Sequence, residues 1–265
     1  MPEIDLGPRG RLHYIDTDQS GKAVVLLHGL GADGSSWGLQ IPALFELGFR
    51  VLAPDAPGFG QSTFIGDPPG ISQTADLYAE WFACLNLRKP HLVGISMGGV
   101  IALQLALDRP QLVDRLVLVN TFARFQIRPQ TWLYYLKRFL LVSYAGPKAQ
   151  AQSVAKRIFP DPEDIDYRNE LVRQILQADP RAYRNAMVSM SRFNVLHRLP
   201  SINLPTLVVT GGRDTTVPER MQASMAKRIP AARQVVITTA GHALTIDEPE
   251  QFNNLLMNFL RIEAR

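Results

Sequence analysis

The serine at position 96 lies within residues 94–99, whose sequence is Gly-Ile-Ser-Met-Gly-Gly. An apolar run over residues 91–93 precedes this segment, and apolar residues at helical spacing over 100–107 follow it. A serine flanked by glycines between a strand and a helix is typical of a nucleophile elbow, which exposes the hydroxyl at the top of a sheet. The alternative is a glycine-rich turn in which the hydroxyl only caps the helix. We favour the elbow, with Ser96 as the candidate nucleophile.

A serine hydroxyl is a weak nucleophile and needs a base within hydrogen-bond reach, most often an imidazole that a carboxylate orients. The sequence has five histidines. His242 is the candidate base, because it follows the last predicted strand, residues 234–238, and the elbow predicts the order serine, acid, histidine along the chain. The other four lie at or near strand starts, in the central segment or after the first buried strand: His13, His91, His197 and His28.

The candidate acid is Asp214, which follows the predicted strand over residues 206–210. The alternative is that Asp214 only shapes the turn after that strand. Asn120, at the end of the strand predicted over 116–119, cannot supply an anion. Asp247 comes five residues after the candidate base, and we expect it to begin the following helix instead.

The reaction of a serine with a carbonyl also needs two donors for the oxyanion that forms. The main-chain N–H of Met97 is the first candidate, because it follows the nucleophile at a helix N-terminus. The second is the N–H of Leu30, in the loop after the buried strand predicted over residues 23–27. We expect His28 to help hold that loop and Asp55 to brace its own proline- and glycine-rich loop.

Strands alternate with helices up to residue 120 and again from residue 201, which predicts a parallel sheet covered by helices. Ligands of such sheets bind beyond the carboxyl ends of the strands, where all the candidate residues lie. Residues 121–200 show helical patterning and carry 13 Lys and Arg against 6 Asp and Glu. We therefore predict an α/β core formed by 1–120 and 201–265, with 121–200 as a helical cap over the carboxyl edge.

Five motifs occur along the chain in a fixed order, and with them the sequence resembles the serine members of the α/β-hydrolase superfamily, in particular carboxylesterase-like members. They lie at residues 28–31, 55–62, 94–99, 212–214 and 241–242. The resemblance covers essentially the whole chain. It implies an eight-stranded, mostly parallel sheet with helices on both faces and a helical cap inserted after strand six. Haloalkane dehalogenases and epoxide hydrolases are similar, but they carry an aspartate at the position of Ser96.

The resemblance implies a serine hydrolase that cleaves carboxylic esters of small or medium acyl substrates through an acyl-enzyme. Several alternatives to this activity stay open. One is an enol-lactonase, since residues 119–121 resemble the corresponding residues of that class, and the others are a perhydrolase, an acyltransferase and a ligand-binding protein without turnover. C–C bond hydrolases also stay open, although they usually have tryptophan where this chain has Ala243. Aromatic and methionine side chains of the cap could line an acyl pocket or simply pack between helices: Phe122, Phe125, Trp132, Tyr134, Tyr135, Phe139, Met187 and Met190.

The composition is that of an ordinary globular protein, with 46% hydrophobic and 20% charged residues among 265. The N-terminus does not resemble a signal peptide and no apolar run is long enough to span a bilayer, so we expect a cytoplasmic protein without stable membrane insertion. Cys84 is the single cysteine and is expected to fill core space. We expect a small-molecule ester substrate, no metal, no cofactor and no nucleic-acid partner. The oligomeric state stays open.

Overall fold

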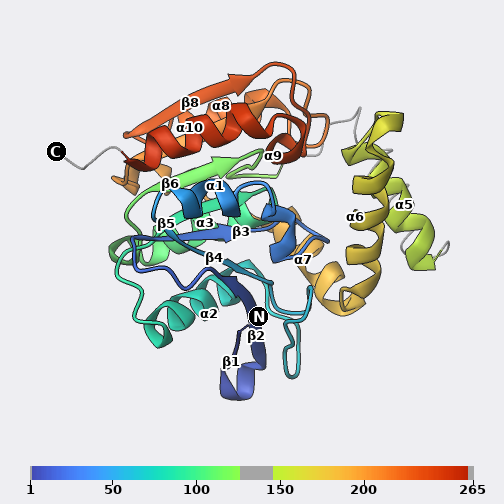
Figure 1. The fold of residues 1–265 in the computed structure, drawn as a ribbon, viewed down its shortest axis with the longest axis horizontal. Helices are drawn as coiled ribbons and strands as arrows, with labels where there is room; N and C mark the ends of the chain where they lie inside the picture. The colour runs from blue at the N-terminus through green and yellow to red at the C-terminus, as the bar shows by residue number, and fades with distance from the viewer. Residues whose placement is uncertain (1, 126–145, 262–265) are drawn as a thin grey trace.

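The computed structural model describes residues 2–125 and 146–261, and Figure 1 shows their arrangement. Within this part of the chain, one sheet has eight strands in the order β1-β2-β4-β3-β5-β6-β7-β8. The strands from β3 to β8 run parallel to one another, and β2 is antiparallel to both β1 and β4. The strands are β1 (Glu3–Asp5), β2 (Arg11–Asp16), β3 (Ala23–Leu27), β4 (Arg50–Pro54), β5 (His91–Ile95), β6 (Leu116–Val119), β7 (Thr206–Gly211) and β8 (Ala232–Ile237).

The central strands are apolar on both faces because helices cover both faces of the sheet. In β3, Val25 and Leu27 belong to the hydrophobic cluster on one face, whereas Val24 and Leu26 belong to the cluster on the other. This alternation follows from the two-residue period of a strand. The helices are α1 (Ile41–Glu46), α2 (Ile71–Cys84), α3 (Met97–Asp108), α5 (Gly146–Ile158), α6 (Ile165–Gln177), α7 (Pro180–Arg192), α8 (Glu219–Ala226), α9 (Leu244–Asp247) and α10 (Pro249–Arg261).

Two layers of helices sandwich the sheet. Buried side chains of α2, α3 and α8 belong to one hydrophobic cluster, and those of α1, α9 and α10 belong to the other. Helix α3 is apolar almost all round, since ten of its residues are buried. It therefore lies in the middle of its layer, in contact with β3, β5 and β6 and with its neighbour α2. The predicted α/β-hydrolase architecture is thus confirmed.

The segment after β6 is helical where the structure describes it, in agreement with the predicted cap. Figure 1 shows α5 and α6 beside the sheet, at the end toward which the arrowheads of β6 and β8 point. The two connections between this segment and the core lie side by side. Val195 N–H donates to Ala123 O at 2.9 Å, and Arg124 and Asn194 form an isolated β-bridge. The exact division of the chain at residues 120 and 200 stays a prediction.

Candidate active site

Ser96 lies between β5 and α3 in a strained main-chain conformation, with φ 51° and ψ −113°. A non-glycine residue adopts such a conformation only where its surroundings enforce it. The glycines on either side permit the close approach that does so. A Cβ atom on Gly94 would collide with the main-chain oxygen of Gly98, and one on Gly98 would collide with the main-chain oxygen of Leu27. The elbow geometry predicted from the sequence is therefore present.

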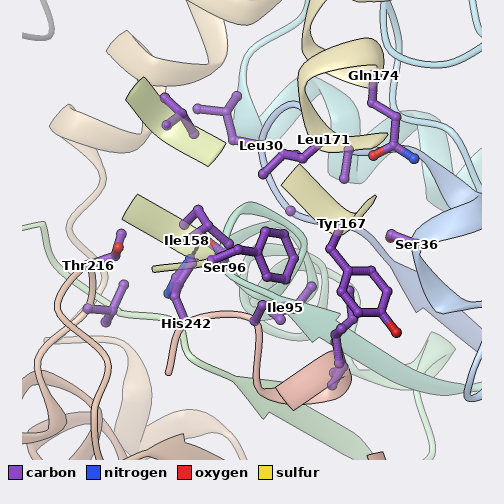
Figure 2. Close-up of a pocket in the computed structure, with 18 of the residues that line it drawn as sticks. Leu30, Ser36, Ile95, Ser96, Ile158, Tyr167, Leu171, Gln174, Thr216 and His242 are labelled. Carbon is purple, nitrogen blue, oxygen red and sulfur yellow. Dashed lines mark hydrogen bonds between the residues drawn. The ribbon is translucent and has the colours of Figure 1, made fainter. Parts of the chain in front are cut away.

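The structure brings the three candidate side chains together, although they are far apart along the chain. His242 Nε2 lies 3.1 Å from Ser96 Oγ, and His242 Nδ1 lies 2.8 Å from Asp214 Oδ2. Figure 2 shows His242 beside Ser96 at the wall of a pocket. The Asp214 side chain is fully buried, and 11% of the His242 side chain is exposed. A hydroxyl, an imidazole and a carboxylate thus form one continuous hydrogen-bonded chain from the pocket into the protein.

The surroundings of Asp214 determine which nitrogen of His242 carries the proton. Asp214 Oδ1 accepts hydrogen bonds from the main-chain N–H groups of Thr216 and Val217, at 2.7 and 2.9 Å. Its other oxygen faces His242 Nδ1. A carboxylate can only accept, so Nδ1 carries the hydrogen of the neutral imidazole and Nε2 offers its lone pair to Ser96. This is the arrangement in which the imidazole can take up the hydroxyl proton.

The two candidate oxyanion donors are available. Within the part of the chain that the structure describes, neither the main-chain N–H of Leu30 nor that of Met97 donates a hydrogen bond to another residue. Met97 is the first residue of α3, so its N–H lies at the positive end of the helix dipole. Leu30 and Ser96 both line the same cavity. The fold thus leaves both N–H groups unused, and their role as oxyanion donors stays a prediction.

The loop of Leu30 is held in the way that the sequence predicts. His28 Nε2 accepts a hydrogen bond from Ala56 N–H at 2.8 Å, and Nδ1 donates to Gly29 O at 2.8 Å. The imidazole thereby links the loop after β3 to the loop after β4. Asp55 braces the second loop, because its carboxylate accepts from the N–H groups of residues 34 and 61 and pairs with His13. Both expected supporting roles are confirmed.

Asp247 does not have the role that we predicted. It is the last residue of α9, and its carboxylate accepts a hydrogen bond from Gly241 N–H at 2.7 Å. The sequence suggested a helix start because Pro249 follows closely. In the structure α9 ends at Asp247, and the carboxylate reaches Gly241, six residues earlier, and so supports the loop of His242. Burial raises the pKa of Asp247, although the hydrogen bond from Gly241 lowers it in part.

A cavity of about 590 Å³ opens above Ser96 and is lined by the core and the helical segment after β6. Of the aromatic and methionine side chains proposed as its lining, Phe122, Phe125, Met187 and Met190 do line it. The other four lie outside the described residues: Trp132, Tyr134, Tyr135 and Phe139. The size of the cavity is that of an ordinary small-molecule site.

Helix α6 supplies a part of the lining that was not predicted from the sequence. Tyr167, Leu171 and Gln174 all border the cavity, as Figure 2 shows. Gln174 is buried, and its Nε2 lies 3.1 Å from Ser35 Oγ and 3.2 Å from Asp33 Oδ1. The spacing of four and three residues places these side chains on one helix face. That periodicity was readable from the sequence, but nothing in it told which neighbour the face would meet.

Two further findings concern the described residues as a whole. None of their helices is both long and apolar enough to cross a bilayer. No group of three or more His, Cys, Asp or Glu side chains among them is arranged to hold a metal ion.

Comparisons with known proteins agree with this geometry. Residues 22–249 match the family described as alpha/beta hydrolase fold. A protein of Caulobacter vibrioides, named "Putative carbamate hydrolase RutD", is 32% identical over 271 residues, which cover 98% of this chain and 99% of that protein. The crystal structure of an enol-lactonase from Burkholderia xenovorans matches with a TM-score of 0.88 and 26% identity, over 98% of this chain and 99% of that chain.

A thermophilic esterase from Thermogutta terrifontis matches with a TM-score of 0.83 and 30% identity, over 95% of this chain and 93% of that chain. The similarity thus extends over nearly the full length of all three proteins. This chain is a hydrolase that belongs to the α/β-hydrolase family.

Proposed function

We propose that this hydrolase cleaves carboxylic esters through an acyl-enzyme formed on Ser96. The observation that carries the proposal is the hydrogen-bonded chain from Ser96 through His242 to Asp214. His242 Nε2 takes the hydroxyl proton while Ser96 Oγ forms a bond to the ester carbonyl carbon. The N–H groups of Leu30 and Met97 stabilise the oxyanion of the tetrahedral intermediate.

Collapse of that intermediate breaks the bond to the leaving alcohol, and His242 returns the proton to the alcohol oxygen. A water molecule then attacks the acyl-enzyme in the same way, with His242 as the base. The buried carboxylate of Asp214 stabilises the imidazolium that forms in each half of the reaction. The products are a carboxylic acid and an alcohol, and Ser96 is regenerated.

The cavity favours uncharged, largely apolar acyl groups of small or medium size. Its described lining is mostly apolar and includes no Lys or Arg. The one carboxylate of this described lining, that of Glu170, is already paired with Arg173, whose Nε donates to it at 2.8 Å. An anionic acyl group would therefore lose its hydration without gaining a cation from the described lining. The Lys and Arg residues that the structure describes between residues 146 and 200 all lie outside the lining of this cavity.

A second candidate substrate is an enol-lactone, a cyclic ester that the same chemistry would open. The likeness to the enol-lactonase over nearly the whole chain favours it. The name of the Caulobacter relative adds carbamates, whose carbonyl carbon is also open to attack by a serine. Rates measured side by side with p-nitrophenyl esters of graded acyl length, an enol-lactone and a carbamate rank these three classes.

The test of the proposal is the variant Ser96→Ala. We expect its turnover of a short p-nitrophenyl ester to fall by at least about a thousandfold, because no other group can form the acyl-enzyme. The protein should lose its covalent labelling by a fluorophosphonate while it keeps its circular dichroism spectrum. Ser201→Ala is the matched control, since Ser201 is exposed and its hydroxyl donates only to Arg198 O. Undiminished turnover by Ser96→Ala would refute the assignment.

A further inference from the structure

We infer that two adjacent residues at the end of β6, Asn120 and Thr121, are positioning residues that hold the nucleophile, the base and the loop of the acid in register. This inference rests on the proposed function. β6 lies between β5, which leads into Ser96, and β7, which leads toward Asp214. The end of β6 is therefore the place from which short side chains can reach both neighbouring loops.

Asn120 connects the loop of the base to the loop of the acid. Its side-chain Nδ2 donates to the main-chain oxygens of Gly241 and His242, at 2.8 and 2.9 Å. Its Oδ1 accepts from Gly211 N–H at 2.7 Å, and Gln222 Nε2 lies 3.4 Å from the same oxygen. Gly211 is the last residue of β7, three positions before the acid. One amide group thus bridges the two loops that must present Asp214 and His242 to each other, and it adds to the main-chain hydrogen bond from Arg213 N–H to Ala240 O.

Asparagine meets the three requirements of position 120, which concern side-chain polarity, side-chain length and main-chain conformation. The carbonyl oxygens can only accept and Gly211 N–H can only donate, so the side chain must offer a donor at one end and an acceptor at the other. A glutamine would add a methylene group at a position with no exposed area. The main chain at Asn120 has φ 43°, a left-handed conformation that asparagine tolerates better than most residues. Length, polarity and backbone conformation therefore agree.

Thr121 holds the nucleophile from the same strand end. Its Oγ1 donates to the main-chain oxygen of Ser96 at 2.7 Å, and its exposed area is also zero. The side chain packs against the elbow helix, because a Cβ atom on Gly99 would come within 2.6 Å of Thr121 Cβ. The main-chain N–H of Ser96 in turn donates to Val119 O at 3.0 Å. The strained residue is thus fastened at both its N–H and its carbonyl group.

Neither Asn120 nor Thr121 lines the cavity, so their loss should change the rate of the chemical step and not the affinity for substrate. A displacement of about 1 Å between reacting groups can reduce a rate on the order of 100-fold. We expect Thr121→Val to lower kcat by about 10-fold or more with KM within about threefold of the wild-type value. Thr121→Ser keeps the hydroxyl and should restore kcat to within about threefold.

Asn120→Asp is the second variant, since it keeps the shape of the side chain but removes both donated hydrogen bonds when ionised and one when protonated. We expect it to lower kcat by at least about 30-fold, again with little change in KM. If Asn120→Asp does not fold, the comparison of Thr121→Val with Thr121→Ser still tests the inference.

The matched control is Thr206→Val. Thr206 is also fully buried, and its hydroxyl donates to Leu204 O at 2.9 Å, but it lies at the opposite end of β7. We expect this control to lose a similar amount of stability in urea unfolding and to keep kcat within about twofold. An equal loss of kcat in the control would show that Thr121 acts through general stability alone and would overturn the inference.

The inference would also be overturned if Thr121→Val kept the wild-type kcat, or if kcat of Thr121→Ser were as low as that of Thr121→Val. Ser96→Ala separates these outcomes from failure of the proposed function. If Ser96→Ala keeps its turnover, the serine mechanism itself is wrong. If Ser96→Ala is inactive while Thr121→Val matches the wild type, only the positioning role is wrong.

Discussion

Replacement of the buried acid by its amide, Asp214→Asn, is the sharpest test of how the site is built. The N–H groups of Thr216 and Val217 both point at one oxygen of Asp214. In the variant those two donors will keep the amide oxygen, so the amide NH2 group must face His242 Nδ1. Two donors cannot share a hydrogen bond, and His242 will move its proton from Nδ1 to Nε2. The imidazole will then present a hydrogen, and no lone pair, to Ser96.

The expected cost is a loss of about 10⁴-fold in kcat, as found where a serine protease loses its acid in the same way, or about 5 kcal/mol of transition-state stabilisation. The variant should fold, because every main-chain donor around the side chain keeps its acceptor. Ester hydrolysis and the rate of fluorophosphonate labelling measure the effect. Both should fall together, since both need the hydroxyl proton removed.

Asp247→Asn is the matched control for this experiment. Asp247 is a second carboxylate close to the base, and among the described residues the single hydrogen bond that it accepts comes from Gly241 N–H, which an amide oxygen can accept as well. We expect kcat of this control to stay within about tenfold of the wild type. If Asp214→Asn also stayed within tenfold, the imidazole would not depend on that carboxylate, and Asp214 would not be the acid of the site.

Two further predictions concern stability. Gly98→Ala places a Cβ atom against the main-chain oxygen of Leu27, so we expect a loss of about 3 kcal/mol in urea unfolding, whereas Gly38→Ala, with space for its Cβ, should lose less than about 1 kcal/mol. Equal losses would contradict the close approach. Burial lowers the pKa of the His91 imidazole to about 4, so the native state holds it neutral while the unfolded chain takes up a proton below about pH 6.5. Stability should therefore decline as the pH falls from 6.5 to 4, by roughly 2 kcal/mol at pH 4.5, and His91→Gln should lack this part of the decline. If the wild type and His91→Gln lost the same free energy of unfolding between pH 7 and pH 4.5, this role of His91 would be contradicted.

Local features of the site could be predicted because they depend on neighbours along the chain. The elbow at Ser96 needs a strand, two glycines and a helix within a short segment, and each leaves its own mark in the sequence. The strand before Asp214 and the helix over 249–261 follow from apolar periodicity in the same way. Apolar spacing predicts a single helix over residues 35–47, whereas the structure has a short 3₁₀ helix at Gly34–Trp37 and then α1, which begins at Ile41 and has Pro42 in its first turn.

Partners across the sheet could not be predicted with the same means. An amide cannot supply an anion, so Asn120 could be excluded as an acid from the sequence, but nothing there indicated that its amide would meet the carbonyl of His242, 122 residues away. The expected role of Asp247 was wrong for a similar reason, since its contact with Gly241 depends on how α9 folds back toward the loop of His242. The sequence periodicity of α6 predicts that it has an apolar face, but it does not predict that this face borders the cavity.

The sequence by itself thus determined the residue types and the local conformations: a strained serine, a histidine and an aspartate after strands, and a helical segment after β6. Such features arise from interactions over a few residues, which the order of side chains records directly. The tertiary structure decided which of the available polar groups meet. Hydrogen bonds require partners within about 3 Å, and only the order of the strands brings Asn120 and Thr121 between the three loops they connect.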